Sequence, residues 1–197
     1  MLFRTGLNLD LYDSTYDFIC NSIKVQNAKI LELGCGPGNI SKYLLNKRKD
    51  FDLLGIDVAP NMIELAKINN PNGQFLQMDI RNINEIKGKF DGIISGFVLP
   101  YISHLDSNKF LNDCYELLNE GGLLYLSFVE GDPDKSDYKT ASTGDRSFFY
   151  YYNLDELKQQ LFNHKFGVPT LMKVDFKRSE TEVEIHTILM TFKTTNR

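Results

Sequence analysis

Three closely spaced glycines directly follow a short, uniformly apolar run, and this feature constrains the fold more than any other. The run covers residues 28–33 (AKILEL), and the glycines are Gly34, Gly36 and Gly38. An apolar run without polar alternation is typical of a strand buried on both faces of a parallel sheet. Glycine lacks a Cβ, so the backbone can turn tightly there and approach a ligand closely. With a helical pattern at residues 40–47, the segment predicts a strand–loop–helix unit whose loop lies at the carboxyl edge of a parallel sheet, where ligands bind.

Strand and helix patterns alternate along the rest of the chain. Further strand-like runs cover residues 51–57, 74–78, 90–97 and 122–129, and helical patterns cover 9–25, 61–69 and 106–118. The last two strand-like runs, 171–177 and 183–192, are joined by the short polar segment 178–182, which permits only antiparallel pairing. The sequence therefore predicts an α/β fold: a doubly wound, mostly parallel seven-stranded sheet with helices on both faces and a C-terminal antiparallel hairpin.

Polar residues near the start of each helical pattern are the expected helix caps. An N-cap side chain accepts a hydrogen bond from a free N–H of the first turn. The expected caps are Asp13 or Ser14, Asn61 and Asp106. The pattern at 61–69 also places its apolar residues on one face of the helix, namely Met62, Leu65 and Ala66.

Composition disfavours several classes of function. The 197-residue chain carries a net charge of −4, which disfavours nucleic-acid binding because that affinity comes largely from Lys and Arg neutralising phosphates. No apolar stretch approaches the length that crosses a bilayer, and the N-terminus lacks a signal-peptide pattern. We therefore expect a cytoplasmic protein without a membrane partner, built as one domain over residues 1–197. Reduced thiols and no metal site are expected, since no CxxC or metal-ligand spacing links Cys20, Cys35, Cys114, His104, His164 and His186.

Two residues beside the glycines indicate which ligand the loop binds. A dinucleotide fingerprint, G-x-G-x-x-G, requires a third glycine where this chain has Asn39, so a nicotinamide cofactor is disfavoured. Glu32 precedes the loop, and its carboxylate could hold a ligand ammonium group directly or through a water. The N–H groups at the start of the following helix favour a carboxylate. The loop therefore suits the amino-acid end of a ligand.

At these residues the chain resembles the class I S-adenosylmethionine-dependent methyltransferases. The first motif of that family reads E-x-G-x-G-x-G, and Glu32, Gly34, Gly36 and Gly38 match it, with Cys35 and Pro37 between the glycines. The resemblance implies that the loop wraps the methionine part of S-adenosyl-L-methionine and that S-adenosyl-L-homocysteine is the product. The cofactor contacts it implies in this segment are Glu32, Gly34, Cys35, Gly36, Gly38 and Asn39. The alternative is a glycine-rich turn that binds no ligand.

The second and third strands supply further candidate cofactor contacts. Asp57 ends the second strand, where a carboxylate can accept hydrogen bonds from both ribose hydroxyls. By resemblance, Val58 and Met62 flank the adenine, although Met62 taken alone suits the core better. Asp79, after the third strand, inherits a hydrogen bond to the adenine amino group; the alternative is that it caps the following turn. By the same resemblance, Ile80 covers the ring.

The fourth strand leads toward the acceptor side. Residues 90–103 match the family's fourth motif in placement, so Ser95, Gly96 and Phe97 are candidate cofactor contacts. The segment LLNEGGLLYLS (117–127) matches a scaffold region that carries no chemistry. Specific motifs cover residues 28–127, and the similarity then continues only in architecture. A DNA or RNA amino-methyltransferase usually has an Asn/Asp-Pro-Pro-aromatic stretch at the fourth strand, which this chain lacks.

The sequence leaves the catalytic residue unassigned. A sulfonium methyl is already electrophilic, so much of the rate enhancement can come from holding the reactants in line. His104 is a candidate for a base, and a surface histidine is the alternative. We expect the loop 130–153 to be an acceptor-side element and residues 1–27 to form a helical lid region. The candidate substrate contacts are Tyr12, Tyr16, Tyr101, Arg146, Tyr150 and Tyr151; the alternative for 148–152 is simple packing on neighbouring structure.

The leading functional hypothesis is methyl transfer by direct displacement to a small-molecule acceptor. The alternatives are a methyltransferase acting on tRNA or protein, and a non-catalytic S-adenosylmethionine-binding protein. Metal-assisted transfer is not supported because no carboxylate or amide cluster can be assembled near the acceptor. The sequence leaves the acceptor and the oligomeric state open.

Overall fold

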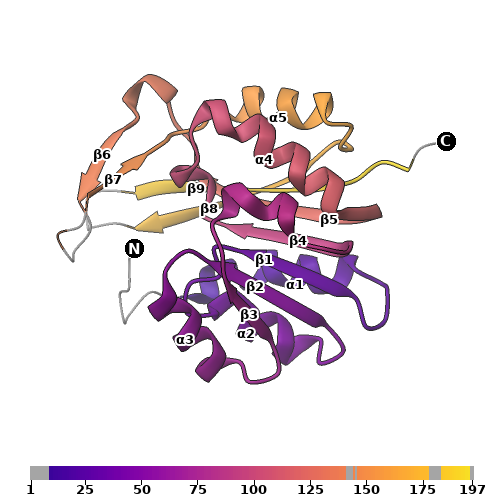
Figure 1. Cartoon of the computed structure of the whole chain (residues 1–197). Coiled ribbons are helices and arrows are strands. Elements are labelled where there is room, and N and C mark those ends of the chain that lie inside the picture. Colours follow the sequence, from indigo (N-terminus) through magenta and orange to yellow (C-terminus); the bar gives the residue numbers. More distant parts are fainter. Residues whose placement is uncertain (1–8, 141–143, 145, 178–182, 196–197) are drawn as a thin grey trace.

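A computed structural model describes residues 9–140, 144, 146–177 and 183–195, and it contains a central seven-stranded sheet (Figure 1). The strand order is β3-β2-β1-β4-β5-β9-β8. The pairs β1–β2, β1–β4, β2–β3 and β4–β5 are parallel, whereas β9 runs antiparallel to both β5 and β8. The predicted sheet and its C-terminal antiparallel pair are confirmed. Its strands are β1 (Lys29–Leu33), β2 (Asp52–Asp57), β3 (Gln74–Gln77), β4 (Phe90–Gly96), β5 (Leu118–Val129), β8 (Thr170–Lys177) and β9 (Val183–Phe192).

The order of the strands reverses between β1 and β4. From β1 the chain first builds outward through β2 to β3, and then returns to add β4 and β5 on the other side. At such a reversal the connections leave the sheet toward opposite faces, which opens a crevice at the carboxyl ends of the strands. The glycine loop follows β1, so the topology sets it beside this crevice.

Two apolar layers sandwich the sheet. One face carries α1 (Asp13–Ser22), α2 (Asn39–Lys47) and α3 (Pro60–Asn69); the other carries α4 (His104–Leu117), α5 (Leu154–Asn163) and the 3₁₀ turn η2 (Ile80–Glu85). Alternate residues of β1 serve the two layers: Ile30 packs on the α1 side, and Leu31 and Leu33 pack on the α4 side. This is why β1 reads as a continuous apolar run. No helix of the described residues is long and apolar enough to cross a membrane.

The helix starts correct three sequence expectations. The N-cap of α4 is Ser103, not Asp106: the Ser103 hydroxyl accepts the Asp106 N–H at 3.1 Å and donates to its carboxylate at 2.6 Å. Such a reciprocal pair stabilises a first turn from both sides. Ala59, not Asn61, occupies the N-cap of α3; of the residues expected on one face of this helix, Met62 and Ala66 are buried and Leu65 is 42% exposed. At the start of α1 the N-cap position is Tyr12, without a side-chain cap, and the 3₁₀ turn η1 (Leu9–Tyr12) precedes it.

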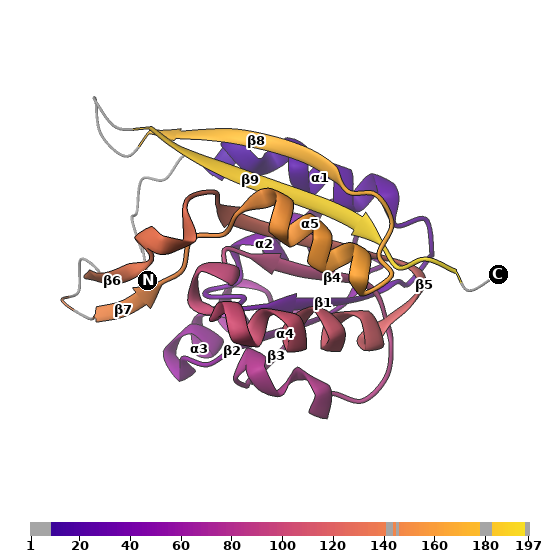
Figure 2. The same ribbon diagram turned by 90° about the horizontal axis from the view of Figure 1, so that it is seen from above.

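The expected acceptor-side loop, 130–153, contains more structure than the sequence indicated. A 3₁₀ turn, η4 (Pro133–Lys135), leads into an antiparallel hairpin of β6 (Asp137–Thr140) and β7 (Arg146–Phe149), which projects past the main sheet (Figure 2). Residues 141–143 and 145 of this segment lie outside the described residues. So do 178–182, the expected connection of the last two strands, and 1–8 of the expected lid region.

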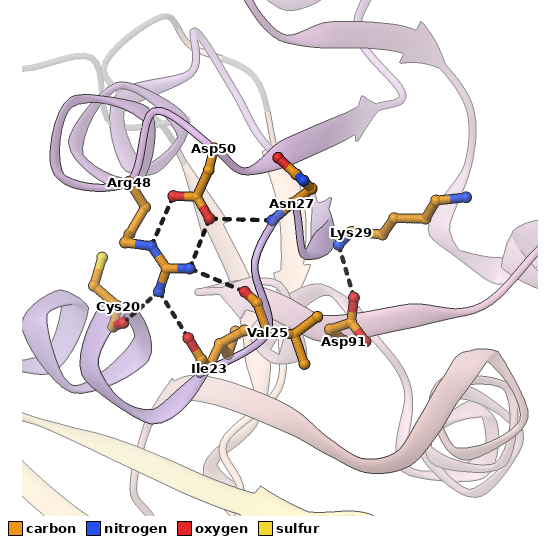
Figure 3. Close-up of polar contacts among 8 residues, drawn as sticks. All are labelled: Cys20, Ile23, Val25, Asn27, Lys29, Arg48, Asp50 and Asp91. Carbon is orange, nitrogen blue, oxygen red and sulfur yellow. Dashed lines mark hydrogen bonds and ion pairs between the residues drawn. The ribbon is translucent and has the colours of Figure 1, made fainter.

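A single arginine fixes the C-terminal end of α1 (Figure 3). Arg48 donates hydrogen bonds to the carbonyl oxygens of Cys20 at 3.0 Å, Ile23 at 2.7 Å and Val25 at 3.0 Å. Its guanidinium also forms a two-pronged ion pair with Asp50, which holds the pKa of that carboxyl below its usual range. Carbonyls at a helix C-terminus lack intrahelical partners, so a cation there both satisfies them and complements the helix dipole. Arg48 thereby anchors the N-terminal helix to the end of α2.

Candidate functional site

The glycine loop adopts a backbone that only glycine tolerates well. Gly34, Gly36 and Gly38 have φ values of 64°, 52° and 82°. A Cβ on Gly34 would lie 2.5 Å from Cγ2 of Val98, and one on Gly38 would lie 2.2 Å from Nδ2 of Asn70. Conformation favours glycine at all three positions, and lack of space adds to this at Gly34 and Gly38. The tight turn predicted between strand and helix is confirmed.

Asp57 joins the glycine loop to the end of β2. This buried carboxylate accepts the N–H of Gly36 through Oδ2 and the N–H of Ala59 through Oδ1, each at 2.9 Å. The Cys35 N–H donates to the Ile56 carbonyl at 2.8 Å, which ties the same loop to β2 a second time. Each carboxylate oxygen has a further lone pair for another donor. The β1 loop and the β2 end thus form one hydrogen-bonded unit at the carboxyl edge of the sheet.

Glu32 lies beneath the loop and is almost completely buried, at 1% exposure. Its side chain faces α2, where the Ser41 hydroxyl donates a hydrogen bond to Oε2. Burial raises its pKa to about 8, although the Ser41 bond acts in the opposite direction. The thiol of Cys35 is also buried, so its side chain faces the interior, while Asn39 is exposed at the start of α2. The Glu32 carboxylate is therefore held in the interior against α2.

The residues expected to contact the adenine differ in exposure and in their existing contacts. Val58, directly after Asp57, is 62% exposed, whereas Met62 on α3 is buried at 5%. The carboxylate of Asp79 caps η2 by accepting the Arg81 N–H at 2.9 Å and also pairs with the Arg81 guanidinium. The guanidinium lowers the pKa of Asp79. Asp79 therefore has the capping role that the sequence left as an alternative. The sequence analysis did not identify Arg81 as its partner. Ile80, the next residue of the same turn, is half-buried.

The end of β4 contains an unpartnered polar atom. Ser95 is fully buried, and among the described residues its hydroxyl has no hydrogen-bond partner. An unsatisfied buried hydroxyl costs about 1–3 kcal/mol, so its retention calls for an explanation such as a ligand group. A Cβ on Gly96 would lie 2.5 Å from Cδ1 of Ile40 on α2. Phe97 has a φ of 54° and donates its N–H to the Ser127 hydroxyl at 2.9 Å.

Of the two N-terminal tyrosines, Tyr12 contacts the residue that follows β4. The ring of Tyr12 lies 5.7 Å from Phe97 in an edge-on arrangement and 6.3 Å from Tyr16. Tyr16 in turn lies 5.3 Å from Tyr43 on α2. The Tyr12 hydroxyl shares a hydrogen bond with Nδ1 of His186 at 2.5 Å. Sequence reasoning missed His186 because only strand pairing shows that it lies level with the end of β5.

Two loops meet over the α4 side of the same edge. His104 Nε2 lies 2.9 Å from the Tyr151 carbonyl oxygen, and its ring lies 5.4 Å from the Tyr150 ring. The Tyr150 N–H donates to the carbonyl of Pro100 at 2.8 Å. The candidate residues after β4 and near the end of 130–153 are therefore brought together, as expected for loops above one sheet edge.

Two further candidates on this side lie closer to the hairpin. Tyr101, 51% exposed, packs edge-on against Phe149 at 6.1 Å. Arg146 lies on exposed β7 with its guanidinium 5.0 Å from the Tyr138 ring centre. No group of three or more metal-binding side chains is found among the described residues.

Comparison with known proteins gives a consistent result. Residues 30–122 match the protein-family profile described as "Methyltransferase domain". The malonyl-[acyl-carrier protein] O-methyltransferase 1 of Ilyobacter polytropus is 31% identical over 148 residues, which cover 72% of this chain and 53% of that protein. The chain spans about half the length of the curated relatives it matches.

Solved structures show the same fold at low sequence identity. An S-adenosylmethionine-dependent methyltransferase from Clostridium acetobutylicum has a TM-score of 0.75 at 17% identity, covering 98% of this chain and 95% of that chain. The 1,6-didemethyltoxoflavin-N1-methyltransferase of Burkholderia thailandensis, solved with 1,6-didemethyltoxoflavin and S-adenosylhomocysteine, has a TM-score of 0.68 at 18% identity, covering 93% and 78%. Residues 30–122 are therefore identified as a methyltransferase domain. The fold of the whole chain is the Rossmann-like α/β fold of the class I S-adenosylmethionine-dependent methyltransferases.

Proposed function

We propose that this chain binds S-adenosylmethionine across the carboxyl ends of β1, β2 and β4 and transfers its methyl group to a small-molecule acceptor. The observation that carries the proposal is the Asp57 carboxylate, which holds the glycine loop through Gly36 and keeps lone pairs for a further donor. This arrangement sets an acid for the ribose hydroxyls beside a loop that suits the methionine end. The exposed Val58 next to Asp57 offers an apolar surface for the adenine.

The remaining site residues would then bind and orient the cofactor. The backbone of residues 34–39 faces the methionine part, with Glu32 below it for the ammonium group. The unpartnered Ser95 hydroxyl supplies a donor or acceptor at the end of β4, next to Gly96 and Phe97. When bound, the cofactor supplies an electrophilic methyl group on a sulfonium. The task of the protein is therefore to hold an acceptor in line with it and to exclude water.

A small acceptor is favoured by the character of the acceptor side and by two relatives. Tyr101, Tyr150, Tyr151 and His104 form an aromatic wall from two loops, which suits a compact, partly apolar molecule. The Ilyobacter relative is named for a malonyl group on a carrier protein, and the Burkholderia protein for a small heteroaromatic compound. In this proposal residues 1–197 act as one domain, with the N-terminal region as lid and 130–153 as the acceptor-side element.

Calorimetric titration with S-adenosylhomocysteine tests the cofactor site. Asp57→Asn should weaken binding by about 10-fold to 100-fold, because an uncharged amide replaces the acceptor for the ribose. Asp52→Asn, at the exposed start of the same strand, is the matched control and should bind like the wild type. Wild-type protein that does not bind the ligand at millimolar concentration would disprove the cofactor assignment.

Labelled methyl transfer tests the acceptor class. The protein is incubated with S-adenosylmethionine carrying a radioactive methyl group and with a cell extract separated into small metabolites, RNA and protein. We expect label in the metabolite fraction, where mass spectrometry identifies the product. Label in RNA or protein instead would replace the small-molecule hypothesis, and S-adenosylhomocysteine binding without any transfer would indicate a non-catalytic binding protein.

A further inference from the structure

Three polar side chains form a chain beside the candidate methyl-transfer site. The Tyr12 hydroxyl lies 2.5 Å from Nδ1 of His186, and the opposite ring nitrogen of His186, Nε2, lies 3.6 Å from Oε2 of Glu184. Tyr12 and His186 are both buried, each at 7% exposure. The three groups come from two distant parts of the sequence, the N-terminal segment and β9.

The contacts favour one arrangement of the protons. Nε2 faces the Glu184 carboxylate at the ion-pair distance of 3.6 Å, and the negative charge favours a proton on Nε2 of the neutral ring. Nδ1 then has a lone pair and accepts the hydrogen bond that the Tyr12 hydroxyl donates. Burial raises the pKa of Tyr12, and the nearby charge of Glu184 acts in the same direction. Tyr12 therefore stays protonated and acts as a donor to His186.

Strand register places the three side chains Tyr12, His186 and Glu184 at the edge of the sheet where the ligand is proposed to bind. His186 pairs with Val129 at the carboxyl end of β5, and Gly96 at the end of β4 pairs with Ser127, two residues earlier on β5. His186 thus lies at the level just beyond Gly96. Phe97, the next residue after β4, packs against His186 with ring centres 4.6 Å apart and against Tyr12 at 5.7 Å. Tyr12 and His186 therefore border the residues that face the methionine part of the cofactor in the proposed function.

Polar and aromatic side chains surround the imidazole. The titratable groups around His186 include Tyr12 from the N-terminal segment and Glu184 from its own strand. Phe176 of β8 stacks on the ring at 4.8 Å with an interplanar angle of 13°, and Phe97 covers another side.

We propose that Tyr12, His186 and Glu184 form a proton relay that accepts the proton of the methyl acceptor, whose reacting group is a hydroxyl, carboxylic acid or N–H. This inference rests on the proposed function. Tyr12 is the catalytic residue that touches the acceptor, and His186 and Glu184 act through it. In other enzymes, a hydroxyl next to an imidazole that is oriented by a carboxylate is likewise part of the group that activates a nucleophile.

The step balances without any further reactant. The nucleophilic atom of the acceptor bonds to the methyl carbon as the carbon–sulfur bond breaks, and that electron pair stays on sulfur. The acceptor proton moves to the Tyr12 oxygen while the Tyr12 proton moves to Nδ1 of His186. The resulting imidazolium is stabilised by Glu184 and later releases its proton to water. Because Tyr12 loses and gains a proton together, no free tyrosinate is required.

Nitrogen NMR of histidine-labelled protein, saturated with S-adenosylhomocysteine, tests the relay without measuring activity. His186→Gln identifies the His186 signals among those of the three histidines. We expect Nε2 to carry the proton near neutral pH, Nδ1 to accept a hydrogen bond, and Tyr12→Phe to move the Nδ1 resonance to that of a free ring nitrogen. A proton on Nδ1, or a ring that keeps one protonation state from about pH 5 to 9, would overturn the relay.

Methyl transfer into the metabolite fraction provides the second readout. Tyr12→Phe and His186→Gln should lower kcat about 100-fold or more, as for loss of a general base, while the Kd for S-adenosylhomocysteine changes less than about threefold. Glu184→Gln should have a smaller effect of about tenfold. Tyr115→Phe, which alters a half-buried tyrosine on α4, is the control and should retain wild-type kcat.

The two readouts separate the failure of the relay from the failure of the proposed function. A wild-type rate in Tyr12→Phe overturns the relay but leaves the methyltransferase proposal in place. Absence of transfer by the wild type refutes the proposed function, and the nitrogen spectra still decide whether the hydrogen-bonded chain exists. A fall in the free energy of unfolding of Tyr12→Phe, measured in urea, identifies a rate loss caused by misfolding, and the kcat of His186→Gln then decides.

Discussion

Replacing Asp57 by Asn tests the link between the glycine loop and the second strand. Each carboxylate oxygen accepts one backbone N–H at 2.9 Å, from Gly36 and from Ala59. The side chain of Asn has one acceptor oxygen, so its NH₂ group would face one of the two N–H donors. Loss of one such bond, with a buried donor left unpaired, costs about 1–3 kcal/mol. We expect Asp57→Asn to lower the free energy of unfolding by about 2 kcal/mol without any cofactor present.

Urea denaturation followed by circular dichroism measures this change. Asp52→Asn is the control on the same strand, because Asp52 is exposed and accepts only a 3.3 Å bond from Gln74. Its effect should stay within about 0.5 kcal/mol. Equal midpoints for the two variants would refute the argument that Asp57 holds the loop. A destabilised Asp57→Asn that binds S-adenosylhomocysteine normally would instead refute only the ribose contact.

Three further predictions concern the same region. Gly38→Ala should lower the free energy of unfolding, measured in urea, by at least about 1 kcal/mol more than Gly121→Ala does. Both glycines have a positive φ, but only at Gly38 would the Cβ meet Asn70. Equal losses in the two variants would refute the steric argument. Arg48→Met should lower the free energy of unfolding by about 2 kcal/mol and leave S-adenosylhomocysteine affinity within twofold; a large calorimetric change in affinity would contradict a purely structural role. Burial raises the pKa of Glu32 from its ordinary value of 4.5 to about 8, so the folded state binds more protons than the unfolded state between these two pH values. The free energy of unfolding should therefore fall as pH rises through that window. Glu32→Gln should remove this fall when urea midpoints at pH 5 and 8 are compared, and a parallel pH dependence in both proteins would count against it.

The strands were predictable because burial on both faces leaves a direct trace in the sequence. The run at 28–33 has no polar alternation apart from Lys29 and Glu32, and the structure places β1 in the centre of the sheet. The glycine loop was predictable for a similar reason, since positive φ at three positions leaves little choice of residue. Local signals of this kind depend on residues that are neighbours in the chain.

Features that depend on competition or on distant partners could not be predicted. Ser103 and Asp106 are both good caps, and only the backbone geometry shows that Ser103 is the N-cap and Asp106 its reciprocal partner. The β6–β7 hairpin was missed because its charged and aromatic residues show no clean alternation. His186 and Tyr12 are 174 positions apart, so their hydrogen bond follows from the antiparallel register of β9 on β5, which the sequence does not encode locally.

The hydrogen bonds of Arg48 restrain the C-terminal end of α1 and not its N-terminal end. Its C-terminal carbonyls are held by the guanidinium, whereas the N-cap position carries no side-chain cap. We therefore expect the first turn of α1 to open more readily than its last turn, which Arg48 holds. Hydrogen exchange should accordingly be fast at the amides of the first turn, slow near the anchored end, and suppressed at the first turn once ligands fill the site.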